Sequence, residues 1–129
     1  MNKPNVLIVD DEPDILELLE ITLERMDIQC SCANDLNTAY MLLKENDFQL
    51  CLTDMRLPDG DGLDLVETVQ QKYSTMPIAV ISAHGNMDTA IKALKNGAFD
   101  FLNKPIDLDV LRKLVSSALK LEEPMTTSR

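Results

Sequence analysis

Acidic side chains follow two apolar segments of this sequence, at the point where each segment stops. Asp10 and Asp11 come directly after residues 6–9, and Asp54 closes residues 50–53. Carboxylates a few ångströms apart repel one another and raise one another's pKa unless a cation lies among them. Mg²⁺ prefers carboxylate and carbonyl oxygens, and a substrate phosphate commonly completes its coordination. The acids therefore predict a magnesium site suited to phosphoryl chemistry.

Two later apolar segments end in polar groups of other kinds. Residues 78–81 run into Ser82, and residues 99–103 run into Lys104. A hydroxyl and an ammonium would complete the charge stabilisation that phosphoryl chemistry requires. All the candidate side chains thus stand at the ends of segments that read as strands.

These segments alternate with longer segments of helical periodicity, a pattern typical of parallel βαβ units. Strands are predicted near residues 5–9, 28–33, 49–53, 77–81 and 99–103. Helices are predicted from Pro13 onward and near residues 35–46, 63–73, 86–96 and 107–121. Right-handed crossovers between the strands then give an α/β fold, a three-layer sandwich of doubly wound (βα)5 type. Most strands are apolar on both faces, as expected when helices cover both sides of a sheet.

Length and charge limit the classes of function. The 129 residues suit one domain, and the net charge of -10 argues against nucleic-acid binding by this domain, because the phosphate backbone selects basic faces. No membrane span or secretory signal is recognised, so the predicted location is the cytoplasm. The domain is predicted over residues 1–121. Residues 122–129 lose periodicity and are predicted to be a linker or disordered tail.

The three cysteines suggest reduced thiols, because their number is odd and no export signal accompanies them. Cys30 and Cys32 would share one face of a strand, and Cys51 lies inside an apolar segment. We interpret all of them as small buried hydrophobic residues. A metal or redox pair is the alternative, but no second cysteine pair or nearby histidine supports it.

Together these residues resemble the receiver domains of bacterial two-component response regulators, from about residue 6 to residue 121. The motifs that carry the resemblance are Asp10-Asp11, Asp54 with Leu57-Pro58 and Asp61-Gly62, Ser82-Ala83, and Lys104-Pro105. The resemblance implies a flavodoxin-like parallel sheet of order 2-1-3-4-5, with the site beyond the carboxyl ends of the strands. It also implies a signalling switch that catalyses only its own phosphorylation and dephosphorylation.

By this resemblance, Asp54 is the phosphoacceptor and receives the phosphoryl group from a histidine of a sensor histidine kinase. Mg²⁺ would be bound directly by Asp11 and Asp54, by Asp10 through water, and by the backbone carbonyl of Arg56. Helix capping is the alternative for Asp10 and Asp11, since aspartate is common at helix N-termini.

The same resemblance assigns roles to residues of the later strands. Lys104 would pair with Asp54 before phosphorylation and with a phosphoryl oxygen afterwards, and the Lys104-Pro105 bond is expected to be cis. Ser82 would donate a hydrogen bond to a phosphoryl oxygen. Phe101 would be the switching aromatic side chain, acting by its bulk alone, although an ordinary core position is the alternative.

Two residues are predicted to tune the lifetime of the phosphorylated state. Arg56 and His84 stand two positions after Asp54 and Ser82, where the resembled family places residues that affect hydrolysis. The output surface is expected to comprise the fourth helix, the fifth strand and the fifth helix. On the fourth helix, the spacing of Met87, Ala90 and Leu94 favours core positions.

Within that family, the segments Ser82-Ala83-His84-Gly85 and 97–102 are similar to receivers of the nitrogen-regulator (NtrC-like) class. Such receivers precede an AAA+ ATPase and a DNA-binding helix-turn-helix domain, and the resemblance therefore implies transcription regulation. A homodimer is a further partner consistent with this class. The alternatives are a free-standing single-domain regulator and, more remotely, a Mg²⁺-dependent phosphatase with an aspartyl nucleophile. A nucleotide or flavin binder is disfavoured, because no glycine-rich loop follows the first strand.

Overall fold

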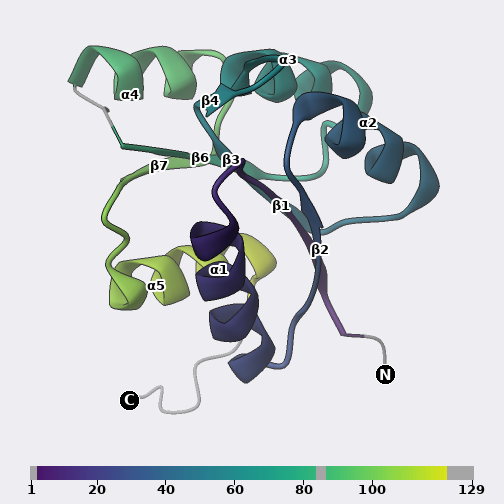
Figure 1. The fold of residues 1–129 in the computed structure, drawn as a ribbon, viewed down its shortest axis with the longest axis vertical. Coiled ribbons are helices and arrows are strands. Elements are labelled where there is room, and N and C mark those ends of the chain that lie inside the picture. Colours follow the sequence, from purple (N-terminus) through teal and green to yellow (C-terminus); the bar gives the residue numbers. More distant parts are fainter. Residues whose placement is uncertain (1–2, 84–86, 122–129) are drawn as a thin grey trace.

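The computed structural model describes residues 3–83 and 87–121, which form a parallel sheet between two layers of helices (Figure 1). The sheet strands are β1 (Asn5–Val9), β2 (Gln29–Ala33), β3 (Leu50–Asp54), β6 (Ile78–Ser82) and β7 (Asp100–Asn103). Their order is β2-β1-β3-β6-β7, and each neighbouring pair is parallel. Numbered as main strands alone, this is the order 2-1-3-4-5, which confirms the predicted fold class.

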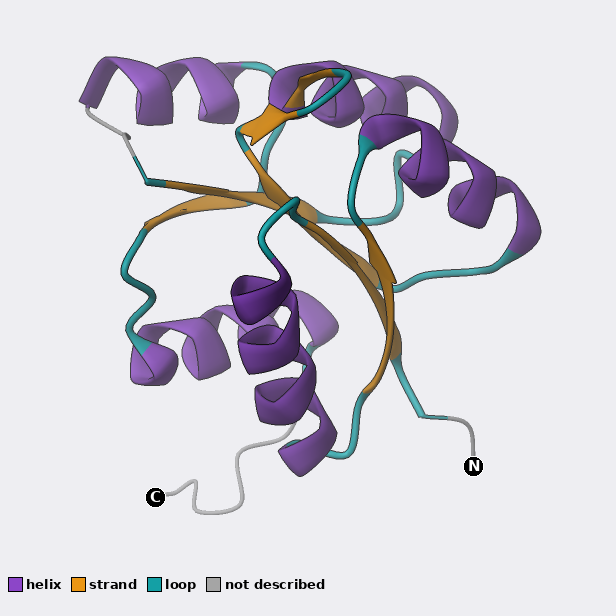
Figure 2. Cartoon of the chain, in the orientation of Figure 1, coloured by secondary structure: helices purple, strands orange, loops and turns teal. Residues whose placement is uncertain are grey.

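Helices cover both faces of the sheet (Figure 2). On one face lie α1 (Pro13–Arg25) and α5 (Leu108–Leu119), and on the other lie α2 (Leu36–Glu45), α3 (Gly62–Lys72) and α4 (Met87–Lys95). The predicted helices agree with these bounds to within about two residues. Pro13 opens α1 as expected, since its fixed φ suits the first helical position.

The sheet divides the core into two clusters. Leu7 and Val9 of β1 pack on the side of α2 and α3, whereas Val6 and Ile8 pack on the side of α1 and α5. Side chains alternate between the faces of a strand, and here both faces are covered. The apolar strands therefore fix the backbone beneath the polar edge from both sides.

A short hairpin follows β3. Its strands are β4 (Arg56–Leu57) and β5 (Gly60–Asp61), which pair antiparallel. At the tip of the hairpin, Asp59 accepts hydrogen bonds from the backbone N–H groups of Leu36 at 2.8 Å and Asn37 at 3.0 Å. These are among the N-terminal donors of α2 that have no partner within the helix. Asp59 thus ties the segment after Asp54 to a neighbouring helix.

The predicted core positions of α4 are wrong for two of three residues. Met87 is 74% exposed and Leu94 is 47% exposed, whereas Ala90 is half-buried. Ala93 is the buried residue of this helix. The periodicity showed that α4 has an apolar stripe, but it could not show that the stripe would face away from the sheet.

Asp59→Asn is expected to destabilise the protein at neutral pH and to lose this effect in acid. Hydrogen bonds from Leu36 and Asn37 lower the pKa of Asp59 below the ordinary value of 3.8. Its carboxylate therefore stabilises the folded state above that value, and the contribution disappears as the pH falls through the lowered pKa. Urea unfolding of wild type and variant between pH 7 and pH 3 measures the difference.

Asp47→Asn is the control, because Asp47 is an exposed acid in the loop before β3 and its substitution changes the net charge equally. A stability difference for Asp59→Asn that stayed constant across the pH range would contradict the assigned role of the Asp59 carboxylate.

Candidate functional site

The carboxyl ends of four strands bring the candidate residues together. Asp10 follows β1, Asp54 ends β3, Ser82 ends β6 and Lys104 follows β7. Asp54, Ser82 and Lys104 line a cavity of about 300 Å³ at this edge of the sheet. Its lining consists of Asp11, Glu12, Asp54, Arg56, Ser82, Ala83 and Lys104. The predicted convergence at the strand ends is therefore confirmed.

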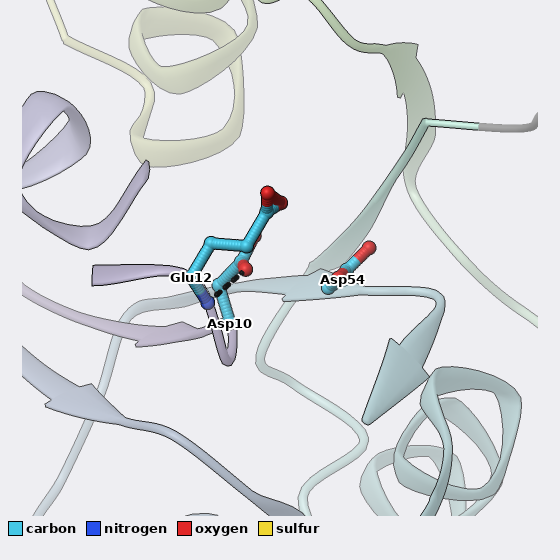
Figure 3. A group of neighbouring side chains, drawn as sticks. All are labelled: Asp10, Glu12 and Asp54. Atoms are coloured by element: carbon cyan, nitrogen blue, oxygen red, sulfur yellow. Dashed lines mark hydrogen bonds between the residues drawn. The ribbon is translucent and has the colours of Figure 1, made fainter. Parts of the chain in front are cut away.

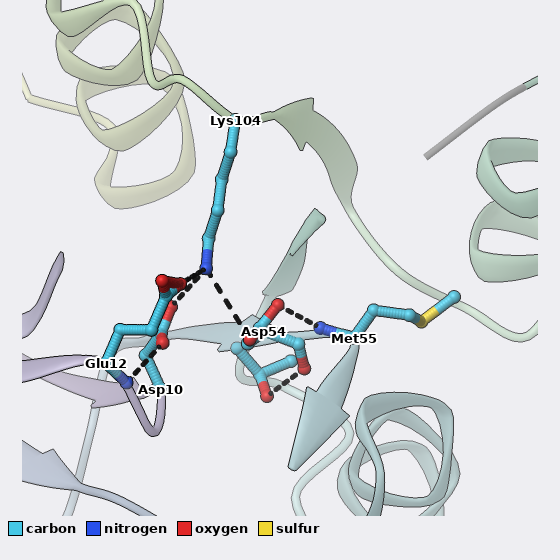
Figure 4. Close-up of polar contacts among 6 residues, drawn as sticks. Asp10, Glu12, Asp54, Met55 and Lys104 are labelled. Atoms are coloured by element: carbon cyan, nitrogen blue, oxygen red, sulfur yellow. Dashed lines mark hydrogen bonds and ion pairs between the residues drawn. The ribbon is translucent and has the colours of Figure 1, made fainter. Parts of the chain in front are cut away.

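The ammonium group of Lys104 lies among three carboxylates (Figure 4). Its Nζ is 2.7 Å from Glu12 Oε1, 3.0 Å from Asp10 Oδ2 and 3.5 Å from Asp54 Oδ2. Burial alone would lower the pKa of Lys104. Hydrogen bonds to Glu12 and Asp10, together with the charges of Asp10 and Asp54, outweigh burial and raise it. The ammonium therefore stays charged, and its predicted pairing with Asp54 is confirmed.

Asp10 and Asp54 are buried acids. Burial raises the pKa of both carboxyls, and the charge of Asp10 raises that of Asp54 further. Backbone donors act in the other direction: Glu12 N–H binds Asp10 Oδ1 at 2.9 Å, and Met55 N–H binds Asp54 Oδ1 at 2.8 Å. One oxygen of each carboxylate is thus held by the backbone, and the other faces the ammonium of Lys104.

The donor set suits a hard divalent cation. Carboxylate oxygens of Asp10, Glu12 and Asp54 lie within 4.8 Å of one another. Figure 3 shows the three side chains. Oxygen ligands of this kind, with room for water, are what such cations require. The charges of these acids exceed the single positive charge of Lys104, so a second cation would relieve the remaining repulsion.

Glu12 is the site residue that the sequence analysis missed. It stands directly after the acid pair and before Pro13, at the N-cap position of α1, where its side chain makes no capping hydrogen bond. Asp11, the predicted direct ligand, is exposed on the cavity wall and lies outside the group of three oxygens. Its metal role stays a prediction. The sequence signal for Glu12 was its place as the third consecutive acid after Asp10 and Asp11.

The other predicted residues lie on the cavity wall, against the core, or outside the described residues. Ser82 is buried on the cavity wall, and Arg56 is an exposed residue of β4 that also lines it. Phe101 is half-buried against the core cluster on the side of α2 and α3. The Lys104-Pro105 peptide bond is cis, as expected. His84 lies outside the described residues, and its tuning role stays a prediction, as do those of Arg56 and Phe101.

The backbone at Gly62 packs closely against the backbone of Asp54 and Met55. Gly62 N–H donates to the carbonyl of Met55 at 2.7 Å, and a Cβ at position 62 would collide with the carbonyl oxygen of Asp54. Met55 N–H in turn donates to the carbonyl of Ile81 at 3.0 Å. Glycine is therefore required here, since any other side chain would displace the backbone that carries Asp54.

The cysteines form no second centre within the part of the chain that the structure describes. All three are free. Cys30 and Cys32 are half-buried against the cluster under α1 and α5, and Cys51 is fully buried on the opposite face. Burial raises the pKa of all three thiols, that of Cys30 to about 12. These observations agree with the interpretation of the cysteines as hydrophobic residues.

Comparison of the sequence with known families and proteins gives one consistent result. Residues 6–116 match the family described as Response regulator receiver domain. The chain is 58% identical, over 96% of its length, to the Response regulator protein PilR of Pseudomonas aeruginosa. It is 35% identical, over 92% of its length, to the DNA-binding transcriptional regulator NtrC of Proteus hauseri. It covers 28% and 25% of these two relatives, respectively.

Solved structures agree with the sequence comparison. The beryllofluoride-activated NtrC4 receiver domain dimer matches with a TM-score of 0.86 and 34% identity, over 90% of this chain and 96% of that one. The receiver domain of NtrX from Brucella abortus matches with a TM-score of 0.84 and 32% identity, over 91% of this chain and 99% of that one.

Among the described residues, no helix combines the length and apolar character needed to cross a membrane.

Gly62→Ala is expected to lower the free energy of unfolding by about 1–3 kcal/mol, the usual cost of overpacking. The new Cβ would meet the backbone of Asp54 and Met55, which cannot move without displacing the site. Gly60→Ala is the matched control and should cost less, because its Cβ would meet Leu36 Cδ1 at 2.6 Å, the end of a flexible side chain. Equal losses in urea unfolding would contradict the requirement for glycine at position 62.

Proposed function

Because the chain belongs to the response regulator receiver domain family, we propose that it is a switch controlled by phosphorylation of Asp54. The observation that supports this most directly is the position of Asp54. It is a buried acid at the end of the central strand β3, and it faces a cavity and the ammonium of Lys104. A carboxylate so placed has the nucleophilic oxygen, the open space and the neighbouring positive charge that phosphoryl transfer needs.

The proposed reaction uses phosphohistidine of a sensor histidine kinase as the donor. An oxygen of Asp54 forms a bond to phosphorus while the P–N bond breaks, and the electron pair of that bond leaves with the imidazole, which takes up a proton. Lys104 and the hydroxyl of Ser82 bind phosphoryl oxygens as charge develops on them. Water later cleaves the acyl phosphate and returns the free carboxylate, at a rate that Arg56 and His84 tune.

Mg²⁺ is part of the proposal, since the donor set suits it. Asp10, Glu12 and Asp54 would offer carboxylate oxygens to the cation, and Asp11 and the carbonyl of Arg56, two residues that line the cavity, are the further candidates. When bound, the cation neutralises negative charge on the transferring phosphoryl oxygens.

The proposed output face comprises α4, β7 and α5. Three residues of α4, spaced to form one stripe, are exposed: Met87, Ile91 and Leu94. Phe99, which directly precedes β7, and Val110 of α5 are also exposed apolar residues. Phe101 of β7 is half-buried against the core cluster, a position from which it could act as the steric switch. Phosphorylation would shift a two-state equilibrium of this face.

The wider context follows from the relatives and remains part of the proposal. Residues 1–121 would be the receiver, and residues 122–129 a linker to AAA+ and helix-turn-helix domains that regulate transcription. The relatives NtrC and PilR are named as regulators, and this chain covers about a quarter of each. A kinase partner, a homodimer and a cytoplasmic location belong to the same proposal.

Phosphorylation is tested by the intact mass of the protein after incubation with acetyl phosphate and Mg²⁺. We expect a gain of one phosphoryl group that requires Mg²⁺ and is absent in Asp54→Asn, because the amide is not a nucleophile. An undiminished gain in the variant would rule out Asp54 as the acceptor.

Cation binding is tested by urea unfolding. In chelator at pH 7, Asp54→Asn is expected to be more stable than wild type by about 1 kcal/mol, since it removes a buried charge that Asp10 repels. The raised pKa of Asp54 means that this difference disappears as the pH falls through it and the wild-type carboxyl becomes protonated.

Mg²⁺ at ten times its dissociation constant should stabilise wild type by about 1.4 kcal/mol and the variant by clearly less. Equal stabilisation of the two proteins would contradict a cation site that includes Asp54.

A further inference from the structure

We propose that Glu12 is a positioning residue that holds the ammonium of Lys104 until a phosphoryl oxygen replaces it. This inference rests on the proposed function. It gives a role to the ion pair between Glu12 and Lys104, which phosphoryl transfer does not itself require. The Glu12–Lys104 contact is the shortest of the three made by the ammonium, at 2.7 Å, and it joins residues 92 positions apart in the sequence.

The argument begins with the number of donors. A lysine ammonium has three N–H groups and no acceptor. In the structure, three carboxylate oxygens surround Nζ, one each from Asp10, Glu12 and Asp54 (Figure 4). The Lys104 side chain is only 9% exposed. A phosphoryl oxygen would be a fourth acceptor, and one of the present acceptors must therefore leave.

The burial of the acids decides which one leaves. The Asp10 side chain is 2% exposed, and its other oxygen is held by the N–H of Glu12. The Asp54 side chain is 10% exposed and carries the phosphoryl group itself. The Glu12 side chain is 57% exposed, so its carboxylate regains water when it turns outward. Releasing Glu12 therefore costs least, as for other exposed ion pairs.

The backbone of Glu12 can remain in place during this exchange. Its carbonyl accepts hydrogen bonds from Ile15 N–H and Leu16 N–H at 3.1 Å each, which fixes it at the start of α1. Its side chain makes no capping hydrogen bond. Rotation of the side chain alone therefore frees one N–H of Lys104, and the helix and the orientation of Asp10 are kept.

The consequence is that the charge of Glu12 slows phosphorylation of the wild type. Glu12→Gln keeps the shape and the oxygen acceptor, but an uncharged acceptor holds an ammonium roughly half as strongly. At saturating Mg²⁺ we expect Glu12→Gln to be phosphorylated by acetyl phosphate about fivefold faster than wild type. A residue that served only as a metal ligand would give no acceleration under these conditions.

Two matched comparisons separate an effect through Lys104 from a general effect of charge. Glu17→Gln makes the same charge change at an exposed position of α1 and should leave the rate unchanged. In a Lys104→Met background, Glu12→Gln should give no acceleration, because the ammonium through which it acts is absent. This double-mutant cycle isolates the pair.

A second readout does not involve the metal-loaded reaction. Urea unfolding in chelator of wild type, Glu12→Gln, Lys104→Met and the double variant should show that the two substitutions are not additive. The corresponding cycle with Glu17→Gln should be additive, since Glu17 belongs to none of the contacts of Lys104.

The inference is overturned if Glu12→Gln is no faster than wild type at saturating Mg²⁺, or if it is accelerated equally in the Lys104→Met background. Additive unfolding energies for positions 12 and 104 would overturn it as well. These outcomes differ from failure of the proposed function, in which the wild-type chain itself would gain no phosphoryl group.

Discussion

The ammonium of Lys104 and the acids around it form the interaction on which this site depends. Asp10 and Asp54 are buried close to each other, and burial raises the pKa of both carboxyls. Without a positive charge between them, the two would not remain ionised together. Lys104 supplies one such charge but leaves the site with excess negative charge. The repulsion between the carboxylates is therefore strongest without a bound cation, and a bound cation lowers it. This difference is a physical basis for control of the site by a ligand.

The remainder of the fold keeps these like charges close together, although their repulsion favours separation. Apolar strands covered on both faces fix the backbone of β1 and β3. Gly62 lets the start of α3 approach the carbonyl of Asp54, and Asp59 fastens the intervening hairpin to α2. A rigid framework of this kind supports a buried charged group, because rearrangement would break several packed contacts at once.

Stability and function are thus opposed at one edge of the sheet. The apolar side of each strand contributes to stability, whereas the carboxyl end concentrates charges that cost free energy until a cation or a phosphoryl group changes their balance. Glu12 lies at the boundary between the two regions: its backbone belongs to α1, while its exposed side chain belongs to the charge network. A boundary residue of this kind can exchange partners without disturbing the core.

The sequence by itself determined the fold class, the positions of the main strands and helices, and the convergence of Asp10, Asp54, Ser82 and Lys104. Alternation of apolar segments carries this information, because parallel strands must all end at one edge. Only the tertiary structure decided that Glu12 joins Asp10 and Asp54 at Lys104, because the turn after β1 brings the Glu12 carboxylate against the ammonium and leaves Asp11 on the cavity wall. It likewise decided that the stripe of α4 faces outward and that a hairpin follows Asp54. Periodicity defines a helix face, but packing alone selects its direction.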